Sequence, residues 1–122
     1  MSKDILVVDD QPGIRLLLKD ILRGEGYKVT TASTGREAIN LLSRGKYSLI
    51  ILDYRLPIID GIGVLKKIQE LELEIPAIMM SGLAEKIEQE VKGFPQVKNI
   101  IAKPFNIDDI TTIVKQSLES DV

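Results

Sequence analysis

The chain has 122 residues, of which 44% are apolar and 28% charged, values typical of one soluble globular domain spanning residues 1–122. The formal net charge of −2 leaves no basic surplus for direct binding of nucleic acid or of an anionic membrane surface. Cysteine and histidine are both absent, which excludes disulfides, thiolate or imidazole metal ligands, and a histidine acting as base or phosphoryl carrier.

Five short apolar runs alternate with longer amphipathic stretches along the chain. Most of these runs are continuous rather than alternating, which indicates strands buried on both faces. The predicted strands are residues 5–8, 27–31, 49–52, 77–80 and 100–102. No run approaches the roughly 20 residues that cross a bilayer, and the first begins too early to leave room for a signal peptide, so we expect a cytoplasmic protein.

The first two predicted helices have clear boundaries. The first carries one apolar face and ends at residues 24–26, which contain two glycines. The residues of that face are Ile14, Leu17, Leu18, Ile21 and Leu22. The second begins with Thr34 and Glu37, a capping box in which each side chain satisfies a backbone N–H group of the other residue, and it ends at Gly45.

Three further helices follow the same logic. The third runs from about residue 61 to residue 71, and the fourth from residue 84 to about residue 91, where the segment 93–95 ends it. The last begins with Asn106 as N-cap, and acidic residues in its first turn suit the helix dipole. Its apolar stripe consists of Ile107, Ile110, Ile113, Val114 and Leu118.

This alternation of five strands and five helices predicts an α/β fold. Parallel strands require right-handed crossovers, so helices should cover both faces of one parallel sheet. Five strands favour the flavodoxin-like, doubly wound (βα)5 arrangement with strand order 2-1-3-4-5. In such a fold the functional crevice lies at the carboxyl ends of the first and third strands.

Polar side chains follow four of the five predicted strands. They are Asp9 and Asp10 after the first, Asp53 after the third, Ser81 after the fourth and Lys103 after the fifth. Each alone is readily explained as a helix cap, a turn or a loop residue. Together they should converge at one edge of the sheet, where three clustered carboxylates repel one another and lose hydration.

A divalent cation resolves this repulsion, and an all-oxygen site suits Mg²⁺. A carboxylate beside Mg²⁺ can attack phosphorus and hold the phosphoryl group as an acyl phosphate. Lys103 and the metal would neutralise the added charge, and the Ser81 hydroxyl with backbone amides near Gly82 would hold the remaining oxygens. The sequence lacks a GxxxxGK[ST] phosphate-binding loop, so the phosphoryl group is expected to arrive on another protein.

These segments resemble the receiver domain of bacterial two-component response regulators, over essentially the whole chain. The resemblance rests on residues 5–10, 52–61, 80–82 and 102–105. Within the family, residues 9–15 and 103–108 are similar to the single-domain regulators of sporulation phosphorelays in spore-forming bacteria.

The resemblance implies a role for each matching residue. Asp53 would accept the phosphoryl group from the phosphohistidine of a sensor histidine kinase. Asp10 and Asp53 would bind Mg²⁺ directly together with the backbone carbonyl of Arg55, and Asp9 would act through a metal-bound water. Ser81 would contact the phosphoryl oxygens.

Lys103 would pair with the phosphoryl group, and the Lys103–Pro104 bond is typically cis in this family. The chain departs from the family pattern at Ile100, where an aromatic residue or histidine is common, and at residues 95–96, where Gly-Ala is usual.

A partner surface is suggested near the same edge of the sheet. Leu16 falls outside the apolar stripe of the first helix, and Pro12, Ile14 and Phe105 lie close to the expected rim. A histidine kinase or a histidine phosphotransferase could pack there and place its histidine over Asp53. Exposed apolar residues are also common without a partner, so this surface is one of two interpretations.

Four functions remain open from the sequence. The leading one is a phosphoryl-accepting signalling domain, not an enzyme, with at most self-catalysed phosphorylation and dephosphorylation. Its phosphoryl group would be relayed onward to a phosphotransferase or read out by a protein partner that binds the phosphorylated domain. A Mg²⁺-dependent phosphatase with an aspartyl-phosphate intermediate would need a second acid two residues after Asp53, where the chain has Arg55. The others are the receiver fragment of a longer transcriptional regulator and an interaction module that is no longer phosphorylated.

Overall fold

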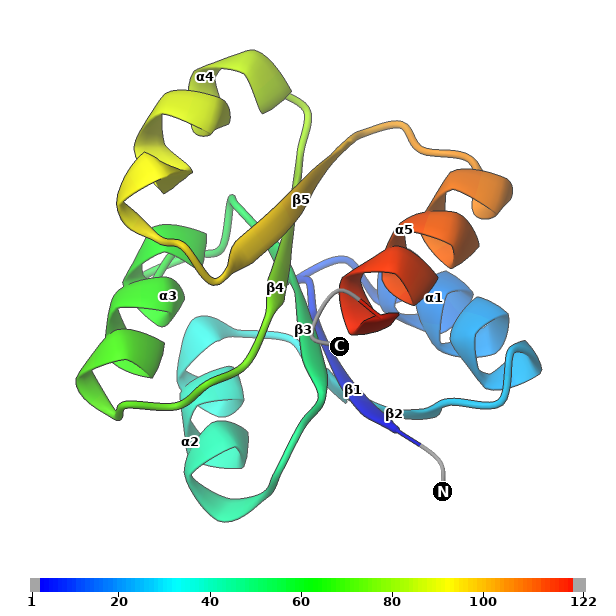
Figure 1. Cartoon of the computed structure of the whole chain (residues 1–122), viewed down its shortest axis with the longest axis horizontal. Coiled ribbons are helices and arrows are strands. Elements are labelled where there is room, and N and C mark those ends of the chain that lie inside the picture. Colours follow the sequence, from blue (N-terminus) through cyan, green and yellow to red (C-terminus); the bar gives the residue numbers. More distant parts are fainter. Residues whose placement is uncertain (1–2, 120–122) are drawn as a thin grey trace.

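The computed structural model describes residues 3–119, which form one five-stranded parallel sheet with helices on both faces (Figure 1). The strands are β1 (Asp4–Val8), β2 (Lys28–Ala32), β3 (Leu49–Asp53), β4 (Ala77–Ser81) and β5 (Val97–Ala102). They pair in the order β2-β1-β3-β4-β5, which confirms the predicted flavodoxin-like topology.

The helices divide into two layers, as Figure 1 shows. They are α1 (Pro12–Gly24), α2 (Gly35–Arg44), α3 (Gly61–Glu70), α4 (Ala84–Glu90) and α5 (Ile107–Glu119), with a short 3₁₀ turn, η1 (Val91–Gly93), after α4. α1 and α5 cover one face of the sheet, and α2, α3 and α4 cover the other. Within residues 3–119, none of these helices has the length and apolar content that a membrane span requires.

Side chains of the central strands point alternately into two separate apolar cores. In β1, Ile5 and Val7 face α1 and α5, whereas Leu6 and Val8 face α2, α3 and α4. All of them are fully buried, because helices cover both faces. The continuous apolar runs of the sequence therefore do mark central strands.

Several local predictions were wrong. Leu17 and Ile107, placed on apolar helix faces, are 39% and 53% exposed, because the buried stripes of α1 and α5 are narrower than the sequence pattern. β5 begins at Val97 instead of Ile100, because β5 lies at the edge of the sheet and includes the exposed Lys98, which breaks the apolar run. The third helix ends at Glu70, and Leu71 is its partly exposed C-cap.

Side-chain caps begin α2, α3 and α5. Thr34 accepts a hydrogen bond from the Glu37 N–H at 3.1 Å, as predicted, but Glu37 accepts in return from the N–H of Ser33, not of Thr34. The return bond thus lies one residue earlier than in the expected capping box, since the Glu37 side chain reaches past the N-cap. Asn106 caps α5 by accepting from Asp109 N–H at 2.8 Å.

The register of the sheet aligns the ends of its central strands. Val8 of β1 lies opposite Leu52 of β3, so the residues that follow, Asp9 and Asp53, lie at the same level. Ser81 lies opposite Ala102 in β5, and Lys103 comes next in the chain. Register alone therefore brings four polar residues to one edge.

Two glycines, at the first positions of α2 and α3, pack so closely against the segment that ends β3 and leads to α3 that neither position has room for a side chain. A Cβ at Gly61 would lie 2.7 Å from the Asp53 carbonyl oxygen, and one at Gly35 would lie 2.5 Å from the Ile59 carbonyl oxygen. Both distances are shorter than atoms tolerate, so these glycines allow α2 and α3 to hold the loop that follows Asp53.

Ile58, within this loop, has a φ of 67° and a fully exposed side chain. A β-branched residue is strained in the left-handed region, at a cost on the order of 1–2 kcal/mol. We expect Ile58→Asn to raise the free energy of unfolding by about 1 kcal/mol, because asparagine tolerates positive φ and no buried contact is lost. Urea-induced unfolding measures this change.

Leu16→Asn provides the control, because Leu16 is also exposed but lies within α1. It should give no gain, since its backbone is helical and asparagine is a poorer helix former than leucine. A lower free energy of unfolding for Ile58→Asn would contradict the strain argument.

Candidate functional site

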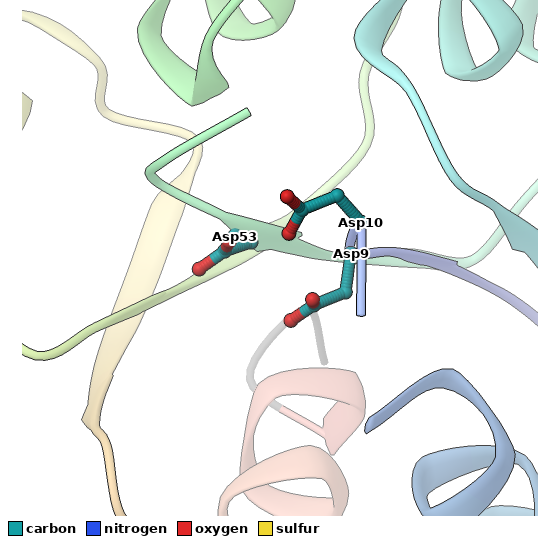
Figure 2. A group of neighbouring side chains, drawn as sticks. All are labelled: Asp9, Asp10 and Asp53. Carbon is teal, nitrogen blue, oxygen red and sulfur yellow. The ribbon is translucent and has the colours of Figure 1, made fainter. Parts of the chain in front are cut away.

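Three carboxylates meet at the carboxyl edge of the sheet. Asp9 and Asp10 extend from the end of β1 and Asp53 from the end of β3, and their side chains gather in one place (Figure 2). A carboxylate oxygen from each lies within 4.8 Å of the others. Asp9 is fully buried and Asp53 nearly so, whereas Asp10 is exposed. The predicted convergence of these residues is therefore present.

Lys103 joins two of the three carboxylates. Its Nζ donates to Oδ2 of Asp9 at 2.8 Å and lies 3.1 Å from Oδ1 of Asp53. The Lys103–Pro104 peptide bond is cis, as the family resemblance implied. The lysine therefore neutralises one carboxylate charge among the three.

Burial and mutual repulsion shift the ionisation of this cluster. Burial raises the pKa of Asp53, and the negative charge of Asp9 raises it further, against the opposing effect of Lys103. Burial works to lower the pKa of Lys103, but its hydrogen bond to Asp9 and its attraction to Asp53 outweigh this, so the pKa lies above the usual value. The single positive charge of Lys103 therefore does not offset the unfavourable burial and mutual repulsion of the carboxylates.

These residues fit a hard divalent cation. Three carboxylates and one ammonium, which contacts only Asp9 and Asp53, leave an excess of two negative charges, and the side-chain atoms that could bind a cation are all oxygens. Exposed Asp10 leaves the cluster open to solvent, which suits Mg²⁺, an ion that retains several of its water ligands. A cluster of this composition can bind Mg²⁺ beside a nucleophilic carboxylate.

A cleft of about 430 Å³ opens over the cluster. It is lined by Asp10, Gln11, Asp53, Arg55, Ser81, Gly82, Leu83 and Lys103. The Ser81 hydroxyl oxygen accepts a hydrogen bond from Leu83 N–H at 2.9 Å, which leaves the hydroxyl proton available to a ligand in the cleft. The predicted hydroxyl, ammonium and acceptor carboxylate therefore share one cavity.

The structure adds residues that sequence reasoning did not single out. Gln11 and Leu83 line the cleft, and Arg15 donates from Nη1 to the backbone carbonyl of Asp9 at 2.8 Å. Tyr54 donates to Glu90 of α4 at 2.6 Å, a bond that raises the pKa of the Tyr54 phenol. No sequence motif indicates these contacts, since they depend on how loops approach helices.

The residues of the expected partner surface have different exposures. Leu16 is 62% exposed and Pro12 is exposed, whereas Ile14 and Phe105 are half-buried and pack against the core beneath α1 and α5. Ile100, at the position where an aromatic residue is common in the family, is half-buried against the opposite core.

Comparison with known proteins adds independent information. The family model of the response regulator receiver domain matches residues 5–115. Sporulation initiation phosphotransferase F of Bacillus subtilis is 37% identical over 119 residues, which cover 97% of this chain and 95% of that protein. Transcriptional regulatory protein SrrA of Staphylococcus aureus is 39% identical over 119 residues, and the chain spans about half (48%) of its length.

Solved structures show the same similarity. A receiver domain protein (CheY-like) from Methanospirillum hungatei superposes with a TM-score of 0.90 at 30% identity, covering 98% of this chain and 96% of that one. TrrA of Thermotoga maritima, crystallised in complex with Mg²⁺-BeF, has a TM-score of 0.79 at 34% identity, covering 94% of this chain and 98% of that one.

Proposed function

Because the chain belongs to the response regulator receiver domain family of two-component signalling, we propose that it accepts a phosphoryl group on Asp53 from a sensor histidine kinase and relays it onward. The observation that carries this proposal is that Lys103, which lines an open acidic cleft together with Asp53, contacts both Asp53 and the buried Asp9. Such an arrangement provides a nucleophile, a counter-charge and access for a donor.

Asp10 and Asp53, with the backbone carbonyl of Arg55, would hold Mg²⁺, and Asp9 would act through a water. This assignment is supported by the exposure of Asp10 and by the two oxygens of Asp9, which are already engaged by Gln11 N–H and by Lys103. When bound, the ion supplies positive charge that lowers the pKa of Asp53 and offsets the charge of the phosphoryl oxygens. Phosphotransfer should therefore depend on Mg²⁺.

In the transfer itself, an Asp53 oxygen attacks the phosphorus of the donor phosphohistidine. The new oxygen–phosphorus bond forms as the nitrogen–phosphorus bond breaks, and the bonding electrons return to the departing imidazole. Lys103 would move from its carboxylate partners toward the phosphoryl oxygens, and the Ser81 hydroxyl would donate to one of them. Arg55, at the rim of the cleft, would shield the acyl phosphate from water.

The acyl phosphate would then pass to a histidine phosphotransferase. Similarity to a phosphotransferase over nearly the full length of both chains supports this relay role. The kinase and the phosphotransferase would dock on Pro12, Ile14, Leu16 and Phe105, and we propose no direct contact with nucleic acid or membrane. The chain would act in the cytoplasm as a phosphoryl acceptor, not as a turnover enzyme.

A second candidate is the receiver module of a longer transcriptional regulator. The match to SrrA supports this alternative, because the chain spans only about half of that protein. Asp53 would accept the phosphoryl group in the same way, but the group would be read out by an attached effector domain instead of being passed on.

Phosphotransfer profiling tests the proposal. The purified chain is incubated with Mg²⁺ and a panel of radiolabelled histidine kinases, and then with candidate histidine phosphotransferases. We expect one acid-stable, base-labile label per chain that moves onward to a histidine. Retention of the label with every phosphotransferase would favour the receiver-module alternative. Multiple turnover of small phosphate esters would indicate a phosphatase, and no labelling even by acetyl phosphate would indicate an interaction module.

A further inference from the structure

Arg15 of α1 contacts the backbone of the acidic site without lining the cleft. Its Nη1 donates to the carbonyl oxygen of Asp9 at 2.8 Å, and its side chain is half-buried. Asp9 lies one residue beyond the end of β1, so its carbonyl has no place in the ladder of the sheet. Because Asp9 is fully buried, this carbonyl needs a partner, and Arg15 provides it.

This contact closes a ring of hydrogen bonds around the β1–α1 turn. The Asp9 carboxylate accepts from Gln11 N–H at 2.9 Å, and the Gln11 carbonyl accepts from the backbone N–H of Arg15 at 3.1 Å. The Arg15 side chain then donates from Nη1 to the carbonyl of Asp9, which completes the ring. The backbone N–H of Asp9 is also hydrogen-bonded, since it donates to the carbonyl oxygen of Ala32 at 3.1 Å. Asp10 lies within this ring, between two residues whose backbones are fixed.

From this ring we infer that Arg15 is a positioning residue for Mg²⁺: it fixes the β1–α1 turn so that Asp10 is presented to the ion. The inference rests on the proposed function, since that function assigns Asp10 as a direct metal ligand. Loss of a group that orients a ligand typically weakens metal binding by about 10- to 100-fold.

The charge of Arg15 and its positioning of Asp10 have opposite expected effects on Mg²⁺ affinity, so a substitution of Arg15 distinguishes them. Arg15 is a cation close to a cation site, so its charge alone opposes Mg²⁺ binding. If only charge mattered, Arg15→Met would bind Mg²⁺ more tightly than the unmodified chain. If Arg15 positions Asp10, the same variant binds Mg²⁺ more weakly.

The experiment titrates Mg²⁺ into the unmodified chain and its variants and follows backbone amide resonances by NMR. We expect Arg15→Met to raise the Mg²⁺ Kd about tenfold, with Arg15→Lys in between because it keeps a donor but not the reach. Arg23→Met is the matched control, since Arg23 is exposed in the last turn of the same helix, and its Kd should stay within twofold.

Labelling by acetyl phosphate provides the second measurement. At saturating Mg²⁺ the rates of Arg15→Met and the unmodified chain should agree within about twofold, because Arg15 does not touch the reacting atoms. Tighter or unchanged Mg²⁺ binding in Arg15→Met would overturn the inference, as would rates that stay apart at saturation. If Arg15→Met does not fold, Arg15→Lys decides by the same criteria.

The two proposals fail in different ways. Absence of labelling in the unmodified chain would refute the proposed function. Normal labelling of the unmodified chain with an unchanged Kd in the Arg15 variants would refute only the role of Arg15.

Discussion

Replacing Asp53 with asparagine is expected to abolish phosphorylation, with a loss of labelling of about 10³-fold or more, the scale seen when a covalent nucleophile is removed. The amide cannot form the acyl phosphate, although it keeps the shape of the side chain. Intact-mass spectrometry after incubation with Mg²⁺ and acetyl phosphate measures the incorporated phosphate.

The same substitution should leave the fold intact and make it more stable without Mg²⁺. Burial and the charge of Asp9 raise the pKa of Asp53, so its ionised form is disfavoured in the folded chain. A neutral amide removes this repulsion and can still accept from Lys103. We therefore expect a higher free energy of unfolding at pH 8 in the absence of Mg²⁺, measured by urea denaturation.

Asp20→Asn is the matched control, because Asp20 is an exposed carboxylate of α1 that plays no part in the cluster. It should be labelled like the unmodified chain. A phosphorylated Asp53→Asn variant would place the acceptor elsewhere and refute the assignment.

Replacing Lys103 with methionine is expected to have the largest effect on stability. Lys103 contacts both Asp9 and Asp53, and its removal leaves two buried carboxylates facing each other without their cation. Breaking a buried ion pair from one side costs about 3–5 kcal/mol, and we expect about 3 kcal/mol at pH 8 because Lys103 is partly exposed. Labelling should also fall, since the phosphoryl group loses its counter-charge.

This loss of stability should depend on pH in a defined direction. A carboxyl whose pKa is raised by folding contributes stability that is fully present below its unfolded pKa and is lost as pH rises through its folded pKa. The pKa of Asp53 is raised in the unmodified chain, and removing Lys103 raises it further, because Lys103 acts to lower it. The deficit of Lys103→Met should therefore be large at pH 8 and shrink as the pH falls toward 4.

Urea unfolding of Lys103→Met at pH 8 and at pH 5, with and without Mg²⁺, measures these effects. Mg²⁺ should restore stability more in the variant than in the unmodified chain, since the ion replaces missing positive charge. Lys98→Met, an exposed lysine of β5, serves as control and should change little at either pH. A deficit that is the same at both pH values would argue that packing, not charge, is responsible.

Much of the site could be predicted because it depends on topology. A parallel sheet directs the carboxyl ends of its strands to one edge, so a polar residue after each strand is sufficient to place Asp9, Asp53, Ser81 and Lys103 together. Asp53, Ser81 and Lys103 line one cleft, and Lys103 contacts the buried Asp9, which confirms this reasoning. The roles of these residues toward Mg²⁺ and phosphate remain predictions that the experiments above address.

The individual hydrogen bonds between side chains distant in the sequence were beyond prediction, even where topology placed the residues at the same edge of the sheet. The bond from Tyr54 to Glu90 joins residues 36 positions apart, and the bond from Lys103 to Asp9 joins residues 94 apart. The exposure of Leu17 depends on how far the neighbouring helices and strands extend, and the spacing of apolar residues along α1 does not specify this.

By itself, the sequence determined the alternation of strands and helices, the strand order and the set of residues at the edge of the sheet, because hydrophobic period and crossover handedness are local or general properties. Only the tertiary structure decided that Lys103 rests between two carboxylates, that Arg15 holds the carbonyl of Asp9, and that Ile58 adopts a positive φ. Each of these depends on the packing of loops against elements far away in the chain, where distances of a few tenths of an ångström decide which partner a polar group finds.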